Sequence, residues 1–83
     1  MPTYAQVEGT IKEVLAKQLG MDVAKINANA LLVDDLGLDS FGSIEIAFEL
    51  EEKFELKIPD KAIYEARTVK DIVDYIAKEK GAV

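Results

Sequence analysis

Apolar side chains recur along most of the chain at intervals of three and four residues, the spacing that places them on one face of an α-helix. The first series starts within Thr3-Tyr4-Ala5-Gln6, which has the form of a helix-opening capping box. Gly20 follows the series and suits the left-handed end of a helix. The pattern predicts a helix over about residues 4–19, with apolar positions Tyr4, Val7, Ile11, Val14, Leu15 and Leu19.

Helical spacing is absent between residues 20 and 38, so a long connection is expected there. It resumes from about Ser40 to Phe54, and Asp39 occupies the N-cap position before it. These residues predict the second helix.

Two more helices are predicted in the last third of the chain. Pro59 interrupts the spacing, because the residue before a proline avoids the helical conformation, and a short helix is expected at about residues 60–66. Thr68-Val69-Lys70-Asp71 then resembles another capping box. The helix that it opens ends near Gly81, and its apolar positions are Val69, Ile72, Val73 and Ile76.

No segment alternates apolar and polar residues over a useful length, so no sheet is expected. The predicted fold is all-α, a small four-helix bundle with three longer helices, one short third helix and a long loop between the first two helices. The length of 83 residues suits one domain, residues 1–83.

The second predicted helix carries two apolar stripes. One is an ordinary core face, formed by Ile46, Ala47, Leu50 and Phe54. The other stripe is formed by Phe41, Ile44 and Phe48 and is flanked by Glu45, Glu49, Glu51 and Glu52. If the helix lies centrally in the bundle, both stripes belong to the core; if it does not, the second stripe is an exposed partner site with a carboxylate rim. Solvent accessibility of the two phenyl rings separates these interpretations.

The net charge of −6 is concentrated in one segment. Residues 34–55 contain eight acidic residues and one lysine, whereas the remainder contains eight acidic and nine basic residues. This distribution excludes a nucleic-acid role, which needs a basic stripe, and favours a partner protein with a basic docking patch.

Composition also limits where the protein is expected to act. The longest wholly apolar run, Ala30–Val33, is far shorter than a membrane span, and residues 1–15 lack the features of a signal peptide. The absence of cysteine excludes disulfides and thiolate metal sites. We therefore expect a cytoplasmic protein that does not insert into membranes.

Ser40 is the candidate for chemistry. At a helix start, a serine is most often a cap whose hydroxyl accepts backbone N–H groups. A nucleophilic role is disfavoured, because the chain has no histidine to act as a base and Gly37-Leu38-Asp39-Ser40-Phe41-Gly42 does not fit the spacing of a Gly-x-Ser-x-Gly elbow. Catalysis is not expected.

A calcium loop is the second alternative for this acidic stretch. An EF-hand loop requires oxygen ligands at its first, third and fifth positions. Counting from Asp34 places Leu36 and Leu38 at the third and fifth positions, and counting from Asp35 places Gly37 at the third. The match fails, so no metal site is expected.

The third alternative is covalent modification, and here the residues resemble a known family. Asp35-Leu36-Gly37-Leu38-Asp39-Ser40 resembles the Asp-Leu-Gly-x-Asp-Ser signature of acyl carrier proteins. Residues 18–20, 49–54, 58–60, 68–69 and 74–76 are also similar to the family, so the resemblance covers nearly the whole chain.

The resemblance implies that Ser40, beside Asp39, carries a 4′-phosphopantetheine arm that a phosphopantetheinyl transferase attaches from coenzyme A. Acyl intermediates are then carried as thioesters on the thiol of the arm. The resemblance further implies a monomeric carrier that docks, through its acidic second helix, to basic patches on acyl-transferring and acyl-modifying enzymes of fatty-acid or polyketide biosynthesis. The residues expected to bind partners are Phe41, Ile44, Glu45, Phe48, Glu51 and Glu52.

The chain departs from the family's usual pattern just after the serine. Phe41 stands where leucine or methionine is usual, Gly42 where an acidic residue is frequent, and Phe48 where methionine is frequent. Gly42 is explained either by close approach of a partner or of the arm, or by neutral drift. These departures favour a specialised member over a housekeeping one.

Two other functions stay open. Asp39-Ser40-Phe41-Gly42-Ser43-Ile44 resembles the corresponding run of D-alanyl carriers, which implies an aminoacyl cargo. An unmodified acidic helical adaptor would share the acidic strip without needing Ser40. The mass of the protein after treatment with a transferase and coenzyme A separates the adaptor from a carrier.

Overall fold

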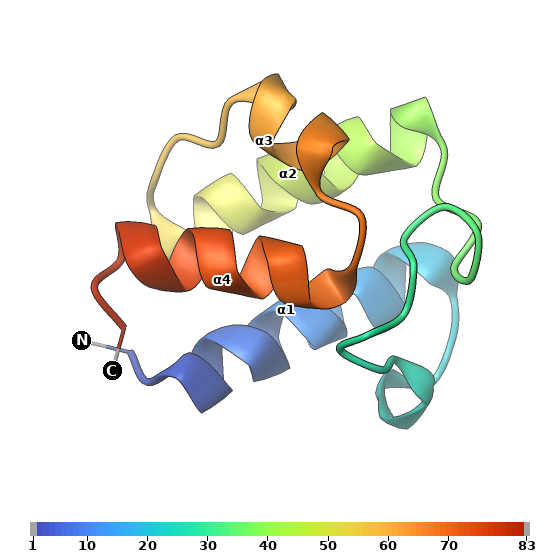
Figure 1. The fold of residues 1–83 in the computed structure, drawn as a ribbon, viewed down its shortest axis with the longest axis horizontal. Helices are drawn as coiled ribbons and strands as arrows, with labels where there is room; N and C mark the ends of the chain where they lie inside the picture. The colour runs from blue at the N-terminus through green and yellow to red at the C-terminus, as the bar shows by residue number, and fades with distance from the viewer. Residues whose placement is uncertain (1, 83) are drawn as a thin grey trace.

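The computed structural model describes residues 2–82, which fold into four α-helices joined by loops (Figure 1). The elements are α1 (Tyr4–Leu19), a 3-10 turn η1 (Val23–Lys25), α2 (Ser40–Phe54), α3 (Asp60–Glu65) and α4 (Val69–Glu79). The predicted all-α bundle, with its short third helix and long first loop, is confirmed. Within residues 2–82, no helix combines the length and apolar character that a membrane span requires.

The helix ends follow the local signals in the sequence. Thr3 opens α1 and Thr68 opens α4, each through a complete capping box. Gly20 ends α1 with φ of 67°, a left-handed conformation that glycine adopts without strain. The third helix ends one residue earlier than predicted, because Ala66 has an extended backbone.

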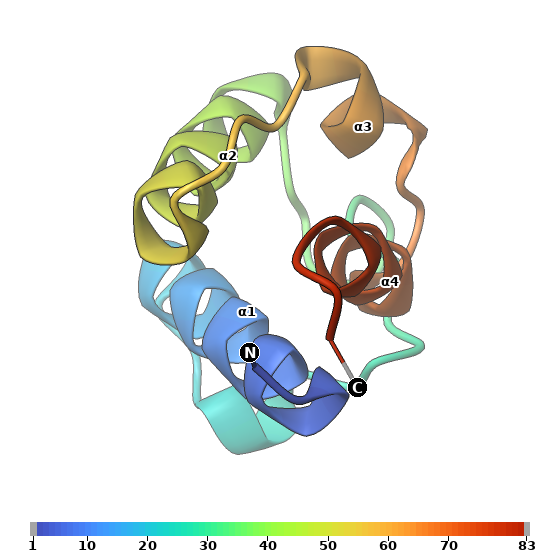
Figure 2. The same ribbon diagram turned by 90° about the vertical axis from the view of Figure 1, so that its left-hand side faces the viewer.

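The four helices surround one shared interior. Viewed nearly along the helices in Figure 2, they follow one another around it in the order α2, α1, α4, α3. Each helix packs against its two neighbours in this ring. The interior is aliphatic, and its most deeply buried large side chains are Val7, Ile11, Leu15, Ile46, Leu50, Val69, Val73 and Ile76.

The loop between α1 and α2 is held in place by hydrogen bonds to the connection between α3 and α4. Leu31 and Thr68 form an isolated β-bridge, and the Leu32 N–H donates to the Arg67 carbonyl at 2.8 Å. The chain then turns so that the Leu38 N–H donates to the Leu32 carbonyl at 2.9 Å. Because the side chains of Leu32 and Leu38 are also buried, the loop orients the start of α2.

Candidate functional site

Ser40 is the first residue of α2, and its side chain is exposed. The capping interpretation of this serine is wrong: the Asp39 carboxylate accepts the Gly42 N–H at 2.7 Å, and no hydrogen bond joins the Ser40 hydroxyl to another described residue. Ser43, the other serine of the chain, donates its hydroxyl to the Asp39 carbonyl at 2.9 Å. The structure therefore leaves the hydroxyl of Ser40 accessible and that of Ser43 engaged.

The start of α2 suits a phosphodiester on Ser40. Among residues 2–82, the backbone N–H groups of Ser40 and Phe41 have no acceptor, as expected in the first turn of a helix. Free N–H groups and the positive end of the helix dipole favour an anionic group there. The carboxylate of Asp39 opposes this attraction, so the phosphate is most favourably placed where it points away from Asp39.

Gly42 has a local role that the sequence did not reveal. It is buried, and a Cβ atom at this position would lie 3.1 Å from the Asp39 Oδ1 and 3.3 Å from the Leu38 Cδ1. A side chain would thus crowd both the capping carboxylate and a core leucine. The absence of a side chain at Gly42 leaves room for the Asp39 cap and for the packing of Leu38. This explanation differs from the two that the sequence suggested, close approach of a partner or of the arm and neutral drift.

The second apolar stripe of α2 is exposed. Phe41 has 71% of its surface accessible, Phe48 65% and Ile44 37%, whereas Leu50 on the core face is fully buried. The interpretation that both stripes belong to the core is wrong, because α2 lies at one side of the ring and packs only with α1 and α3 among the helices. We call Phe41, Ile44 and Phe48 the exposed strip.

The carboxylates beside the exposed strip differ in how they are held. Glu45 accepts a hydrogen bond from the Gln18 side chain at 2.6 Å, and Glu49 lies 3.5 Å from the Lys17 ammonium group. Glu51 accepts the Ile58 N–H at 2.7 Å and so holds the loop after α2. Glu52 is exposed and makes no ion pair with a described residue.

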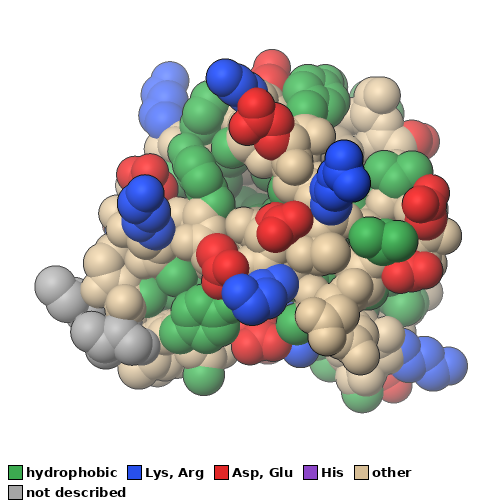
Figure 3. Space-filling view, viewed as in Figure 1, with side chains coloured by type: hydrophobic (Ala, Val, Ile, Leu, Met, Phe, Trp, Pro, Cys, Tyr) green, Lys and Arg blue, Asp and Glu red, His purple; other side chains and the backbone are tan. Residues whose placement is uncertain are grey.

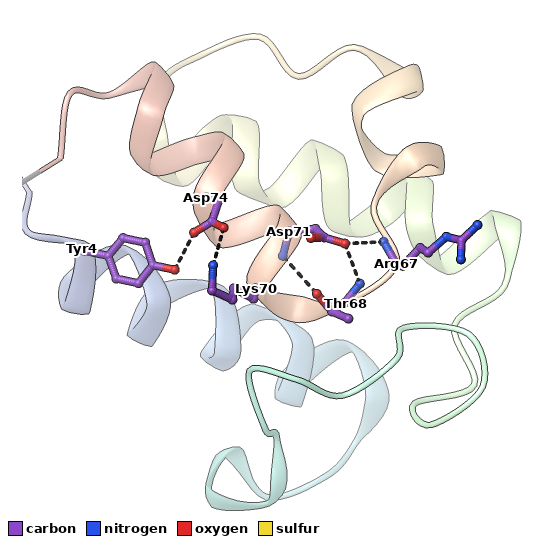
Figure 4. A network of polar contacts seen from close by, with 6 residues as sticks. All are labelled: Tyr4, Arg67, Thr68, Lys70, Asp71 and Asp74. Atoms are coloured by element: carbon purple, nitrogen blue, oxygen red, sulfur yellow. Dashed lines mark hydrogen bonds and ion pairs between the residues drawn. The ribbon is translucent and has the colours of Figure 1, made fainter.

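Shifted pKa values are found on α1 and α4, away from the start of α2 (Figure 4). Hydrogen bonds from Lys70 and from the Tyr4 hydroxyl lower the pKa of Asp74, and the bond to Asp74 in turn raises the pKa of both donors. Backbone N–H groups of residues 67 and 68 lower the pKa of Asp71. The Tyr4–Asp74 hydrogen bond joins α1 to α4, and the bonds that Asp71 accepts close the start of α4.

The sequence analysis missed one group of exposed residues. Val33, Tyr64 and Arg67 lie on two separate loops and a helix, and together with Leu31 they line a cleft. No motif connects the two segments, because residues 31–33 lie more than 30 positions before residues 64–67 and are joined to them by hydrogen bonds between the loops. The lone arginine was the signal that the sequence offered.

Comparison with known proteins identifies the matched family. Residues 9–76 match the family model for a phosphopantetheine attachment site. The chain is 46% identical over 78 residues to an acyl carrier protein of Syntrophobacter fumaroxidans, covering 94% of this chain and 96% of that relative. It is 39% identical over 72 residues to an acyl carrier protein of Bdellovibrio bacteriovorus, covering 87% and 92%.

A solved structure shows the same fold. A chain from Mycobacterium tuberculosis, described as a candidate acyl carrier protein, superimposes with a TM-score of 0.81 and 33% identity. The match covers 88% of this chain and 97% of the other.

Proposed function

The chain belongs to the acyl carrier protein family, and we propose that it carries acyl groups as thioesters on a 4′-phosphopantetheine arm attached to Ser40. Members of this family bind the arm covalently and are carriers rather than catalysts. We further propose that the chain presents its cargo, as a monomer, to enzymes of the fatty-acid or polyketide type.

One observation carries the assignment to Ser40: the serine lies inside the matched region, at the exposed start of α2, with its hydroxyl free. In the attachment reaction, the Ser40 Oγ forms a bond to the phosphorus that carries the pantetheine of coenzyme A. The bond from that phosphorus to the nucleotide breaks, and adenosine 3′,5′-bisphosphate leaves. The chain has no histidine or cysteine, and we propose that the transferase supplies the base that accepts the hydroxyl proton.

Intact-mass measurement tests the attachment. After incubation with a broad-specificity phosphopantetheinyl transferase and coenzyme A, the parent chain is expected to gain one phosphopantetheinyl group, and Ser40→Ala none. Ser43→Ala is the matched control, since it removes the only other serine and is expected to load fully. A parent chain without the mass gain, or loading that follows Ser43 instead, contradicts the proposal. The mass of protein isolated from its source would in addition report an acyl or aminoacyl cargo.

We propose that the exposed strip, with Glu45 and Glu52, forms the surface that binds partner enzymes. Aromatic side chains rimmed by carboxylates are suited to an apolar pocket surrounded by basic groups. Glu51 belongs to the same proposed surface, but its hydrogen bond to the Ile58 N–H gives it a structural role as well. Substitution of Glu51 therefore affects stability and docking together.

Loading kinetics test this surface. Phe48→Ala is expected to raise the KM of the transferase for the carrier by about tenfold, because an exposed aromatic anchor is lost. Val23→Ala, at an exposed apolar residue of η1 outside the strip and outside the cleft lined by Leu31, Val33, Tyr64 and Arg67, is the control and should leave KM unchanged. Equal effects of both variants would contradict the assignment of the docking surface to α2.

A further inference from the structure

A cleft lies between the loop that precedes α2 and the end of α3. Its volume is about 330 Å³, and its lining consists of Leu31, Val33, Asp34, Tyr64, Ala66 and Arg67. The apolar lining is unusually exposed for aliphatic and aromatic side chains, with Val33 at 65% and Tyr64 at 59% accessibility. On the right-hand side of the face in Figure 3, hydrophobic side chains likewise reach the surface among basic and acidic ones.

The backbone connects this cleft to the attachment serine. Arg67 is hydrogen-bonded through its carbonyl to the Leu32 N–H, and the Leu32 carbonyl is bonded to the Leu38 N–H. Leu38 precedes Ser40 by two residues. The loop that forms one wall of the cleft therefore leads directly into the start of α2, where Ser40 lies.

Arg67 is the residue of the cleft that can bind an anion. It is the only arginine of the chain, and its guanidinium forms no ion pair with a described residue. Figure 4 shows that the Arg67 side chain points away from Asp71, which binds only its backbone N–H. By contrast, Lys70 on the adjacent helix is paired with Asp74 at 2.7 Å.

We propose that the cleft between residues 31–34 and 64–67 is the resting site of the chain's own phosphopantetheine arm, with Arg67 binding its phosphodiester. This inference rests on the attachment at Ser40. A guanidinium presents two parallel N–H donors that match two phosphate oxygens, an arrangement that an ammonium group does not offer. The dimethyl and methylene groups of the pantetheine then cover Leu31, Val33 and the ring of Tyr64, while its amides face water.

Charge in the cleft makes Arg67 necessary for this arrangement. Asp34 lines the same cleft and Asp39 caps the adjacent helix, so two carboxylates repel the phosphodiester. The free N–H groups at the start of α2 and the guanidinium are the attractive groups that oppose them. Removal of the guanidinium should release the arm into solvent without preventing its attachment.

Nuclear magnetic resonance of loaded and unloaded protein tests the resting site. The amide resonances of residues 31–34 and 64–67 are expected to shift when the parent chain is loaded. In Arg67→Gln, the ratio of docked to free arm should fall about tenfold, the effect of losing one charge-assisted, bidentate hydrogen bond. The shifts at the cleft should then nearly vanish, while those beside Ser40 persist. Arg67→Lys, which keeps the charge, should restore them in part.

Lys57→Gln is the matched control, because it removes one exposed cation outside the cleft and should leave the shift pattern of the parent. Intact mass verifies loading before each spectrum. Parent shifts confined to residues 38–43, an unchanged pattern in Arg67→Gln, or failure of that variant to load would each overturn the resting site. Failure of the parent itself to gain mass would instead contradict the attachment at Ser40, so the two proposals fail in distinguishable ways.

Discussion

Helices α2 and α4 both begin at a capping residue, but they differ in how many backbone N–H groups of the first turn are bonded and in how much apolar surface is exposed. At the start of α4, Thr68 and Asp71 bind each other's backbone N–H groups in a closed capping box. At the start of α2, Asp39 caps Gly42, and the glycine has no side chain to return the bond. The first turn of α4 is thus satisfied by its capping box and by the carbonyls of Ala28 and Ala30, which accept the N–H groups of Lys70 and Val69. The first turn of α2 keeps free donors and an exposed serine.

The two helices also differ in how much of their apolar surface is buried, and α2 again leaves more exposed. All five buried residues of α4 form one stripe, which faces the interior. α2 buries one stripe in the core and exposes another, in which Phe41 and Phe48 are mostly accessible. The core thus covers the apolar stripe of α4, while α2 combines a core face with an apolar surface that is available to other molecules.

The largest expected effect is the difference in the free energy of unfolding between a variant in a buried stripe and a variant in the exposed strip. Ile76→Ala in α4 should lower the free energy of unfolding by about 2–5 kcal/mol, because the side chain is fully buried and its loss leaves a cavity. Phe48→Ala removes more apolar surface from α2 but should change stability by less than about 0.5 kcal/mol. Urea unfolding followed by circular dichroism measures both. A loss at Phe48 as large as that at Ile76 would show that the exposed strip is packed in solution.

Substitutions at the starts of α4 and α2 should differ by a smaller amount in their effect on the free energy of unfolding. Thr68→Ala opens the capping box of α4 and is expected to cost about 0.5–2 kcal/mol. Ser40→Ala occupies the corresponding end of α2 but breaks no hydrogen bond, so its effect should stay within about 0.5 kcal/mol. The same unfolding measurement applies. If Ser40→Ala lowered the free energy of unfolding as much as Thr68→Ala does, Ser40 would have to be a helix cap, contrary to the structure.

The smallest expected effect is the pH dependence of the contact between α1 and α4. Because the pKa of Asp74 is lowered in the folded state, its stabilising contribution is present above its ordinary pKa of 3.8 and disappears as pH falls through the folded value. Asp74→Asn should therefore be less stable than the parent near neutral pH, and the difference should vanish in acid. Thermal unfolding between about pH 7 and pH 2 measures it. Parallel curves for parent and variant would contradict the assigned pKa shift.

Much of the site could be predicted because its signals are local. The Asp39-Ser40 start of α2 and the two capping boxes depend on residues within four positions of one another, and the structure confirms these helix starts. The predicted N-cap at Asp39 is confirmed, since its carboxylate accepts the Gly42 N–H. The capping interpretation of Ser40 competed with it because two adjacent residues both favour the N-cap.

The sequence offered the exposed strip only as one of two interpretations and did not predict the cleft, because each depends on what lies opposite. Helical spacing places Phe48 on a second face of α2, but whether another helix covers that face depends on the packing of the ring. The bond from Glu51 to the Ile58 N–H depends likewise on the path of the following loop. Arg67 is joined to Leu32, in the loop that precedes α2, by a hydrogen bond between segments more than 30 positions apart.

The sequence by itself determined the number and order of the helices, their starts and the position of the modifiable serine, since capping, proline restriction and apolar spacing act over a few residues. Only the tertiary structure decided that Ser40 keeps a free hydroxyl, that Gly42 makes room for the Asp39 cap and Leu38, and that Phe41 and Phe48 face solvent. Burial and long-range hydrogen bonds are properties of neighbours in space. A side chain becomes available to a partner or to the arm when no such neighbour covers it.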